Sequence, residues 1–126
     1  MSDTGTLSGS IDQLQFAAED GHAESMFLLG IAYAQGRAVE RDDVAAARWF
    51  HLAARKGHVR ARTSLGFLYS VGRGVRRDHV LAYVLLDKAA NEGDPLASDL
   101  LIRLRKQMSP QQLRDAERRA SNRVTG

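Results

Sequence analysis

The 126-residue chain contains no cysteine and only two prolines, and aromatic residues make up 6% of it. The absence of cysteine excludes a disulfide scaffold, a zinc site with thiolate ligands and a cysteine nucleophile. The hydrophobic fraction of 44% and the charged fraction of 26% are typical of a folded soluble protein that favours helices, and not of a disordered chain. The length suits one compact domain or a short repeat array.

The sequence also lacks the features of a targeting or membrane segment. The N-terminal residues MSDTGTLSGS contain neither a basic stretch nor an apolar core, and no later apolar run approaches the length of a membrane span. We therefore expect a cytoplasmic protein with no membrane contact.

Basic residues are missing from the first part of the chain. Residues 1–36 carry five acidic side chains and no lysine or arginine, whereas the remaining 90 residues carry 18 basic and 10 acidic side chains. Residues 55–77 hold seven of the basic side chains and no acid. Arginine dominates, and its planar fork suits carboxylates and phosphates. Two interpretations remain open, namely solvated helix faces or a surface for an anionic partner such as nucleic acid.

The sequence repeats with a period of 36 residues. Shifting the chain by this offset aligns it with itself without a gap, and identical residues coincide along the whole unit. The matches include Gly21/Gly57/Gly93, Ala17/Ala53/Ala89, Gly30/Gly66, Tyr33/Tyr69, Gly36/Gly72 and Asp42/Asp78. The period predicts a structural unit that occurs more than once along the chain.

Each unit contains the signals of two helices. We expect helices at 23–35 and 43–56 in one unit and at 59–71 and 79–92 in the next. Glycines that can adopt a left-handed backbone end the first helix of each unit. Aspartates that can accept hydrogen bonds from the first-turn amides begin the second helix. These residues are Gly36 and Gly72, and Asp42 and Asp78.

The repeat defines the organisation of the chain. We assign residues 1–9 to a flexible N-terminus, 10–21 to a half repeat, 22–57 to repeat one, 58–93 to repeat two, 94–122 to a degenerate repeat helix plus a capping helix, and 123–126 to a tail. Ser109, Pro110 and Gln112 form the signature of a capping box at the start of the last helix. We therefore expect seven antiparallel helices.

The segments LGFLYSVGRGVRRD and LGIAYAQGRAVERDDVAAARWFHLAARKGH resemble the Sel-one-like repeat family, a relative of the tetratricopeptide repeats. This resemblance implies an all-α superhelical solenoid of antiparallel helix hairpins that acts as a non-catalytic adaptor for other proteins. Two positions depart from the family pattern. Ala38 replaces the second glycine of the turn, which predicts a strained loop, and Leu85 and Leu86 replace the aromatic pair Trp49 and Phe50.

Several repeated residues are predicted to be structural. Glycine within a helix costs about 1 kcal/mol relative to alanine. Gly30 and Gly66 therefore indicate close helix contacts that a side chain would block. Tyr33, Tyr69, Trp49, Ala53 and Ala89 fall on positions that the family uses for packing between helices.

The resemblance to tetratricopeptide packing also predicts which residues face the inside of the curve. We expect a partner-binding concave face formed by Phe27, Ile31, Arg60, Thr63, Phe67, Ser70, Arg103 and Lys106. Its three apolar side chains would be partly exposed and would lie beside cationic ones. Such a surface suits a peptide or helix with hydrophobic anchors and acidic residues. The alternative is that neighbouring helices or the cap cover this strip.

Nothing in the sequence indicates catalysis, a metal site or a cofactor. His22 and His58 occupy equivalent turns, where we expect exposed histidines, and His51 and His79 have no partner at metal-ligand spacing. The glycines of residues 65–83 do not form the GxxxxGK[ST] phosphate loop. We therefore predict a protein-binding module and no enzyme. Nucleic-acid binding through the arginines and homo-oligomerisation are the alternatives.

Overall fold

Seven α-helices make up the part of the chain that the computed structural model describes, which is the backbone of residues 3–125 and the side chains of residues 10–122. They are α1 (Asp3–Glu19), α2 (Ala23–Gln35), α3 (Asp43–Arg55), α4 (Val59–Val71), α5 (His79–Asn91), α6 (Pro95–Arg105) and α7 (Pro110–Thr125). Residues 3–125 contain no strand. The prediction of an all-α helical repeat with seven helices is confirmed.

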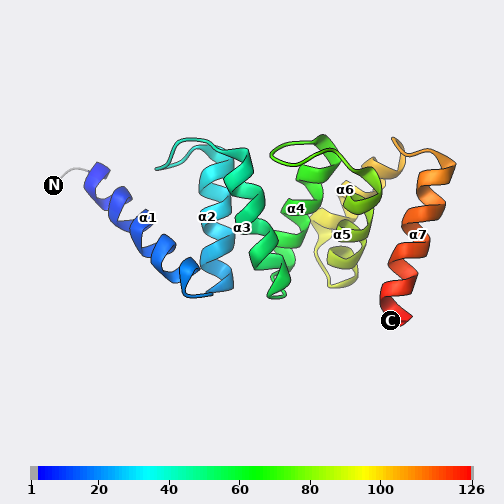
Figure 1. The fold of residues 1–126 in the computed structure, drawn as a ribbon, viewed down its shortest axis with the longest axis horizontal. Coiled ribbons are helices and arrows are strands. Elements are labelled where there is room, and N and C mark those ends of the chain that lie inside the picture. The colour runs from blue at the N-terminus through cyan, green and yellow to red at the C-terminus, as the bar shows by residue number, and fades with distance from the viewer. Residues whose placement is uncertain (1–2, 126) are drawn as a thin grey trace.

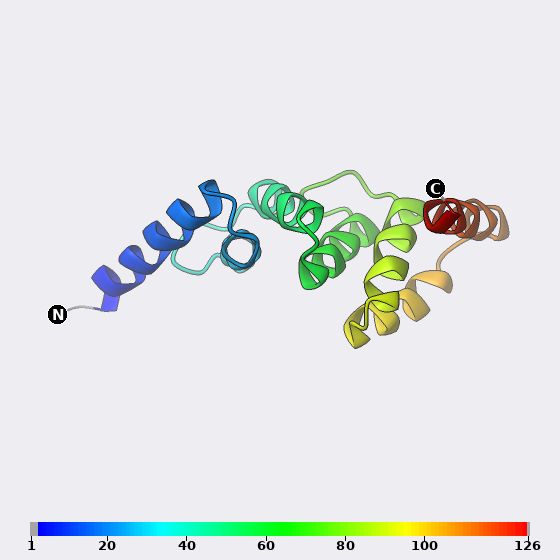
Figure 2. The same ribbon diagram turned by 90° about the horizontal axis from the view of Figure 1, so that it is seen from below.

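The helices form an elongated row with α1 at one end and α7 at the other (Figure 1). Two equivalent hairpins, α2–α3 and α4–α5, form the centre of the row. Helix α1 packs against α2, and α5 packs against both α6 and α7. Viewed from below, α1 points away from the rest of the row (Figure 2). The row has no single central core, so each hairpin depends on its neighbours to bury its apolar side.

The same local signals start and end the helices in both repeats. The side chains of Asp42 and Asp78 accept hydrogen bonds from the third residue of the following helix, at 3.0 Å in both cases. Gly36 and Gly72 end α2 and α4 with φ values of 67° and 75°. The predicted capping box is also present, because Ser109 and Gln112 exchange backbone-to-side-chain hydrogen bonds of 2.9 and 3.1 Å. Local chemistry therefore determines where these helices begin and end.

The two mid-helix glycines lie at the closest helix contacts, as predicted. A Cβ atom on Gly30 would lie 2.6 Å from the ring of Phe50, and one on Gly66 would lie 2.9 Å from Leu86. Real Cβ atoms do not approach other atoms so closely. Phe50 and Leu86, which differ between the repeats, therefore fill the same place in the two hairpins.

The other predicted structural residues lie in or beside the core. Ala53 and Ala89 are fully buried. Tyr33, Tyr69 and Trp49 are half-buried and pack against buried residues. Tyr69 packs against two hydrophobic clusters, one formed by residues of α1 to α4 and the other by residues of α5 to α7, so it joins the two.

The loops before α3 and α5 differ in backbone strain at position 38/74, where the sequence has Ala38 in one loop and Gly74 in the other. Ala38 has a φ of 65°, in the left-handed region that side chains other than glycine rarely adopt. Its counterpart Gly74 has a φ of 72° and lies against α3, where a Cβ atom would be 2.0 Å from the carbonyl oxygen of Asp43. Position 74 therefore has no space for a side chain, whereas Ala38 fits its loop in a strained conformation.

Both ends of the chain differ from the expected boundaries. Helix α1 begins at Asp3, within residues 1–9 that were assigned to a flexible N-terminus, and α7 continues to Thr125 into the residues assigned to a tail. The 36-residue offset aligns residues 7–19 with α3, so the repeat itself extends the helix to the N-terminal side of residue 10. Residues 1–2 and 126 of these predicted segments lie outside the described residues.

Candidate functional site

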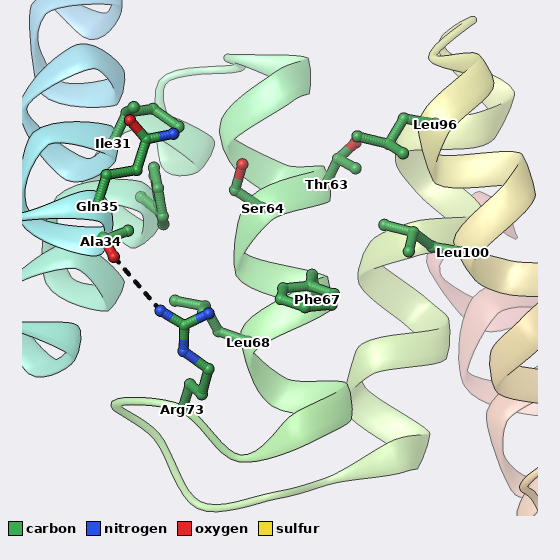
Figure 3. Close-up of a pocket in the computed structure, with 11 residues that line it drawn as sticks. Ile31, Ala34, Gln35, Thr63, Ser64, Phe67, Leu68, Arg73, Leu96 and Leu100 are labelled. Atoms are coloured by element: carbon green, nitrogen blue, oxygen red, sulfur yellow. Dashed lines mark hydrogen bonds between the residues drawn. The ribbon is translucent and has the colours of Figure 1, made fainter.

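The first helices of successive units, α2, α4 and α6, line an open pocket with a volume of about 370 Å³. Figure 3 shows α4 between the other two helices, with side chains from all three pointing into the space. The pocket is lined by Ile31, Ala34, Gln35, Phe50, Thr63, Ser64, Phe67, Leu68, Arg73, Leu96 and Leu100. Most of these side chains are apolar.

Two further depressions continue this pocket along α4. One, of about 360 Å³, shares Ile31, Thr63, Ser64 and Leu96 with it and adds Phe27, Arg60 and Asp94. The other, of about 120 Å³, shares Phe67 and Leu100 and adds Ser70, Val71, Arg103, Leu104 and Gln107. Because neighbouring depressions share walls, they form one continuous surface along α4, which we call the groove.

Seven of the eight predicted partner-binding residues line the groove. They are Phe27, Ile31, Arg60, Thr63, Phe67, Ser70 and Arg103. Lys106 does not line it, because α6 ends at Arg105 and Lys106 is the exposed residue after that end. The structure adds Leu100, Ser64 and Arg73, which the predicted set lacked. The spacing of Leu96 and Leu100, one helical turn apart, was the signal that could have identified Leu100.

The prediction that Phe27 would be partly exposed is wrong, because its side chain is 2% exposed. The ring of His58 stacks on it with a centroid distance of 4.6 Å, and the ring of Phe50 lies at 5.9 Å. The guanidinium carbon of Arg60 lies 4.9 Å from the ring centroid. Phe27 therefore supports the groove from below and presents almost no surface to a partner.

Thr63, also predicted to contact a partner, is 1% exposed. Its hydroxyl donates a hydrogen bond of 2.6 Å to the carboxylate of Asp94, which lies immediately before α6. The same carboxylate accepts a 3.0 Å hydrogen bond from the backbone N–H of Leu96. Thr63 thus helps to attach α6 to α4 and so fixes the width of the groove.

The apolar side chains open to solvent in the groove come from all three helices. Ile31, Phe67 and Leu100 are half-buried, and Leu96 is 56% exposed. They lie on α2, α4 and α6, so a ligand that covers them must span the hairpins. The prediction of partly exposed apolar side chains is therefore correct for Ile31 and Phe67, although not for Phe27.

Arginines lie along the margin of the groove in two different states. Arg73 donates hydrogen bonds to Asp43, at 3.0 Å, and to the carbonyl oxygen of Ala34, at 3.4 Å (Figure 3). Arg60 and Arg103 are exposed, and among the side chains of residues 10–122 no carboxylate forms a salt bridge with either of them. These two arginines are available to pair with a partner's acidic groups.

Asp43 fixes the position of Arg73. Hydrogen bonds from Arg73 and then from Arg41 lower the pKa of the Asp43 carboxyl from 3.8 to about 2. The carboxylate is therefore ionised across the physiological range. Since Asp43 is the first residue of α3, it links the loop that carries Arg73 to the preceding hairpin.

The histidines cap helices and do not form a reactive group. The Nδ1 atoms of His22 and His58 accept hydrogen bonds from the N–H groups of Ser25, at 3.3 Å, and Ala61, at 3.1 Å. His58 is half-buried, not exposed as expected, because Phe27 covers its ring and Glu24 bonds its Nε2 at 2.6 Å. In the described part of the chain, no three histidine or acidic side chains are grouped closely enough to hold a metal ion.

Two of the seven basic side chains of residues 55–77 form bonds within the protein. Arg62 is buried, and its guanidinium bonds the carboxylate of Glu92 and the carbonyl oxygen of Ala54. Arg73 bonds Asp43. These two arginines are therefore engaged inside the protein and lack the exposed arrangement that nucleic-acid backbones require.

Among the described helices, none is long and apolar enough to cross a bilayer.

Comparison with known proteins places these features in a family. The Sel1 repeat model matches residues 23–58 and 59–94, one residue later than the expected repeat boundaries and together more than half of the chain. No curated protein matched the sequence.

Three solved structures show the same arrangement of helices. A protective antigen present in uropathogenic Escherichia coli strains, which displays an SLR fold, is 30% identical and superposes with a TM-score of 0.87 over 94% of this chain and 26% of its own. A Sel1 repeat protein from Oxalobacter formigenes is 37% identical, with a TM-score of 0.75 over 77% of this chain and 28% of its own. Helicobacter pylori cysteine rich protein B is 25% identical, with a TM-score of 0.67 over 72% of this chain and 68% of its own.

The chain spans about a quarter of the length of the first two of these proteins. The match of both repeats to the family model, and the superposition of the helices on those of Sel1 repeat proteins, lead to one conclusion. The chain belongs to the Sel1 repeat family.

Proposed function

We propose that the chain is a non-catalytic adaptor that binds a peptide or helix of another protein in the groove along α4. Sel1 repeats generally serve as protein–protein interaction modules, which supports this role. The observation that carries the proposal is the continuous apolar surface that α2, α4 and α6 share, with Arg60 and Arg103 unpaired at its margin.

The size and composition of the groove support a segment of a protein as the ligand. Ligand pockets typically measure about 300–1000 Å³, and the central part of the groove falls in that range before its two extensions are added. An amphipathic helix binds such a surface through apolar residues spaced three and four positions apart. Acidic residues beside these anchors would pair with Arg60 and Arg103, which adds specificity and speeds association.

The test is the binding of helical peptides selected against the full chain from a random displayed library. We expect the selected peptides to be amphipathic and enriched in Asp and Glu. Fluorescence anisotropy with labelled peptides then gives their affinities. Leu96→Asp introduces a charge into the groove and should weaken binding by about tenfold or more. Arg103→Glu should weaken the acidic peptides selectively and reduce the dependence of their affinity on salt.

The chain offers a matched control on the same helix. Ile102 is 57% exposed and does not line the groove, whereas Leu96 is 56% exposed and does. Ile102→Asp should therefore leave peptide affinity unchanged, and circular dichroism should show the same helix content in both variants. Equal binding by the parent and Leu96→Asp, or selection of no peptide at all, would show that the groove is not the binding site.

A further inference from the structure

The outer face of α1 carries an exposed aromatic side chain between carboxylates. Phe16 is 77% exposed, the highest value among the large apolar side chains of the described residues. Asp12 precedes it by one helical turn and Glu19 follows it by one, so the three lie on one face of the helix. All three are exposed. This face has the features of an amphipathic segment that presents one apolar anchor with acidic residues on both sides.

The corresponding position in the next unit is not exposed in this way. Leu52 aligns with Phe16 at the 36-residue offset, is half-buried and packs against the core of the first hairpin. Phe16 has the larger side chain, but α1 packs mainly against α2 and leaves the ring of Phe16 exposed. An aromatic ring in water costs free energy that burial against another surface recovers, at about 25 cal/mol per Å².

The charges of this face and of the groove are opposite. Residues 1–36 contain five acidic side chains and no lysine or arginine. The groove has the exposed, unpaired Arg60 near one end and Arg103 near the other, on either side of Ile31, Phe67 and Leu96. Its own acid, Asp94, is already engaged by Thr63 and the N–H of Leu96.

The lengths of the two surfaces are also compatible. Arg60 and Ser70, at the two ends of the groove, are ten residues apart on α4, or about 15 Å at 1.5 Å per residue. Asp12 and Glu19 are separated by about 10 Å on the same measure. The acidic face of α1 therefore fits within the groove.

The groove that α1 fits cannot be that of its own chain. Helix α1 packs against α2 at the end of the row opposite to α6 and α7, and it points away from them in both views (Figures 1 and 2). The groove opens between α2, α4 and α6. A helix fixed at that end cannot also lie across α4 and α6, so the contact requires two molecules.

We propose that the acidic face of α1 from one copy of this chain binds in the groove of a second copy. Phe16 inserts between Ile31, Phe67 and Leu96, while Asp12 and Glu19 lie near the two unpaired arginines. This inference rests on the proposed function, since α1 occupies the same groove. The two contacting surfaces are different, so the copies assemble either as a reciprocal pair or head to tail.

The experiment is sedimentation velocity of the full chain over a dilution series, with Phe16→Asp and Leu96→Asp as the two variants. The parent should self-associate more weakly as salt is raised, because charge pairs at the rim are screened. Each variant alone should lose association by about tenfold or more. Val44→Asp and Ile102→Asp, at 61% and 57% exposed sites outside the groove, should associate as the parent does.

Mixing the two variants gives the decisive measurement. Phe16→Asp keeps an intact groove and Leu96→Asp keeps an intact α1, so the mixture should form a one-to-one complex although neither variant associates alone. A parent that stays monomeric, a mixture that stays monomeric, or association that survives both substitutions would each overturn the inference. If the parent still binds the selected peptides in those cases, only the inference fails. If the parent does not bind the selected peptides either, the proposed function is also wrong.

Discussion

Arg62 and Glu92 join the start of α4 to the end of α5 within the second hairpin, and Arg62 also connects this hairpin to the first. The buried guanidinium of Arg62, on α4, bonds the carboxylate of Glu92 after the end of α5 and also the carbonyl oxygen of Ala54 at the end of α3. One side chain thus connects three helix ends. In the 36-residue alignment, Met26 and Ser98 occupy the same position, so this link exists once in the array.

Removing the carboxylate of Glu92 should destabilise the fold more than removing the buried charge of Arg62. Glu92→Ala leaves the buried guanidinium without its partner, and we expect the free energy of unfolding to fall by about 1–3 kcal/mol. Arg62→Met replaces the buried charge with an apolar side chain, so its loss should be smaller. Urea denaturation followed by circular dichroism measures both. An unfolding midpoint for Glu92→Ala equal to that of the parent would contradict this account.

Ala38 and Gly74 should respond in opposite directions to exchange of alanine and glycine. Ala38→Gly relieves a left-handed backbone, which costs an alanine about 1–2 kcal/mol, and should raise the melting temperature. Gly74→Ala adds the same backbone strain and a Cβ atom against the carbonyl oxygen of Asp43, so it should lower the melting temperature by more than Ala38→Gly raises it. Thermal melts of the two variants and the parent test this, and shifts of the same sign would refute it.

Asp43 should make the protein sensitive to acid. Its pKa in the folded protein is about 2, below the ordinary 3.8, because Arg73 and Arg41 donate hydrogen bonds to the carboxylate. The folded state therefore gains stability from this group above pH 4 and loses it as the pH falls from about 4 to about 2. Asp43→Asn should reduce the loss of stability over that range, as measured by urea denaturation at several pH values.

A nearby carboxyl group provides the control for the acid experiment. Glu40 is exposed and lies in the loop before α3, and it forms no salt bridge among the described side chains. Glu40→Gln should leave the acid dependence of the parent unchanged. If Asp43→Asn and Glu40→Gln have the same effect, the hydrogen bonds from Arg73 and Arg41 do not account for the acid sensitivity.

Much of the groove was predictable, because the repeat places equivalent helices side by side. Ile31, Phe67 and Arg103 could be assigned to one surface from their positions in the first helix of each unit. Phe27 was placed correctly on that side but its exposure was not, because the side chains that cover it, His58 and Arg60, belong to the next helix. Lys106 lies outside the groove for a different reason, since α6 ends one residue before it.

The sequence by itself determined the helices and their order, because caps such as Asp42, Gly36 and Ser109 act through hydrogen bonds to residues at most four positions away. It also determined the close contact at Gly30, since a glycine inside a helix needs a neighbour that requires the space. Only the tertiary structure decided which apolar side chains remain exposed in the groove and that α7 packs against α5. Those outcomes depend on the angles and distances between helices, which are set by many weak contacts among residues distant in the sequence.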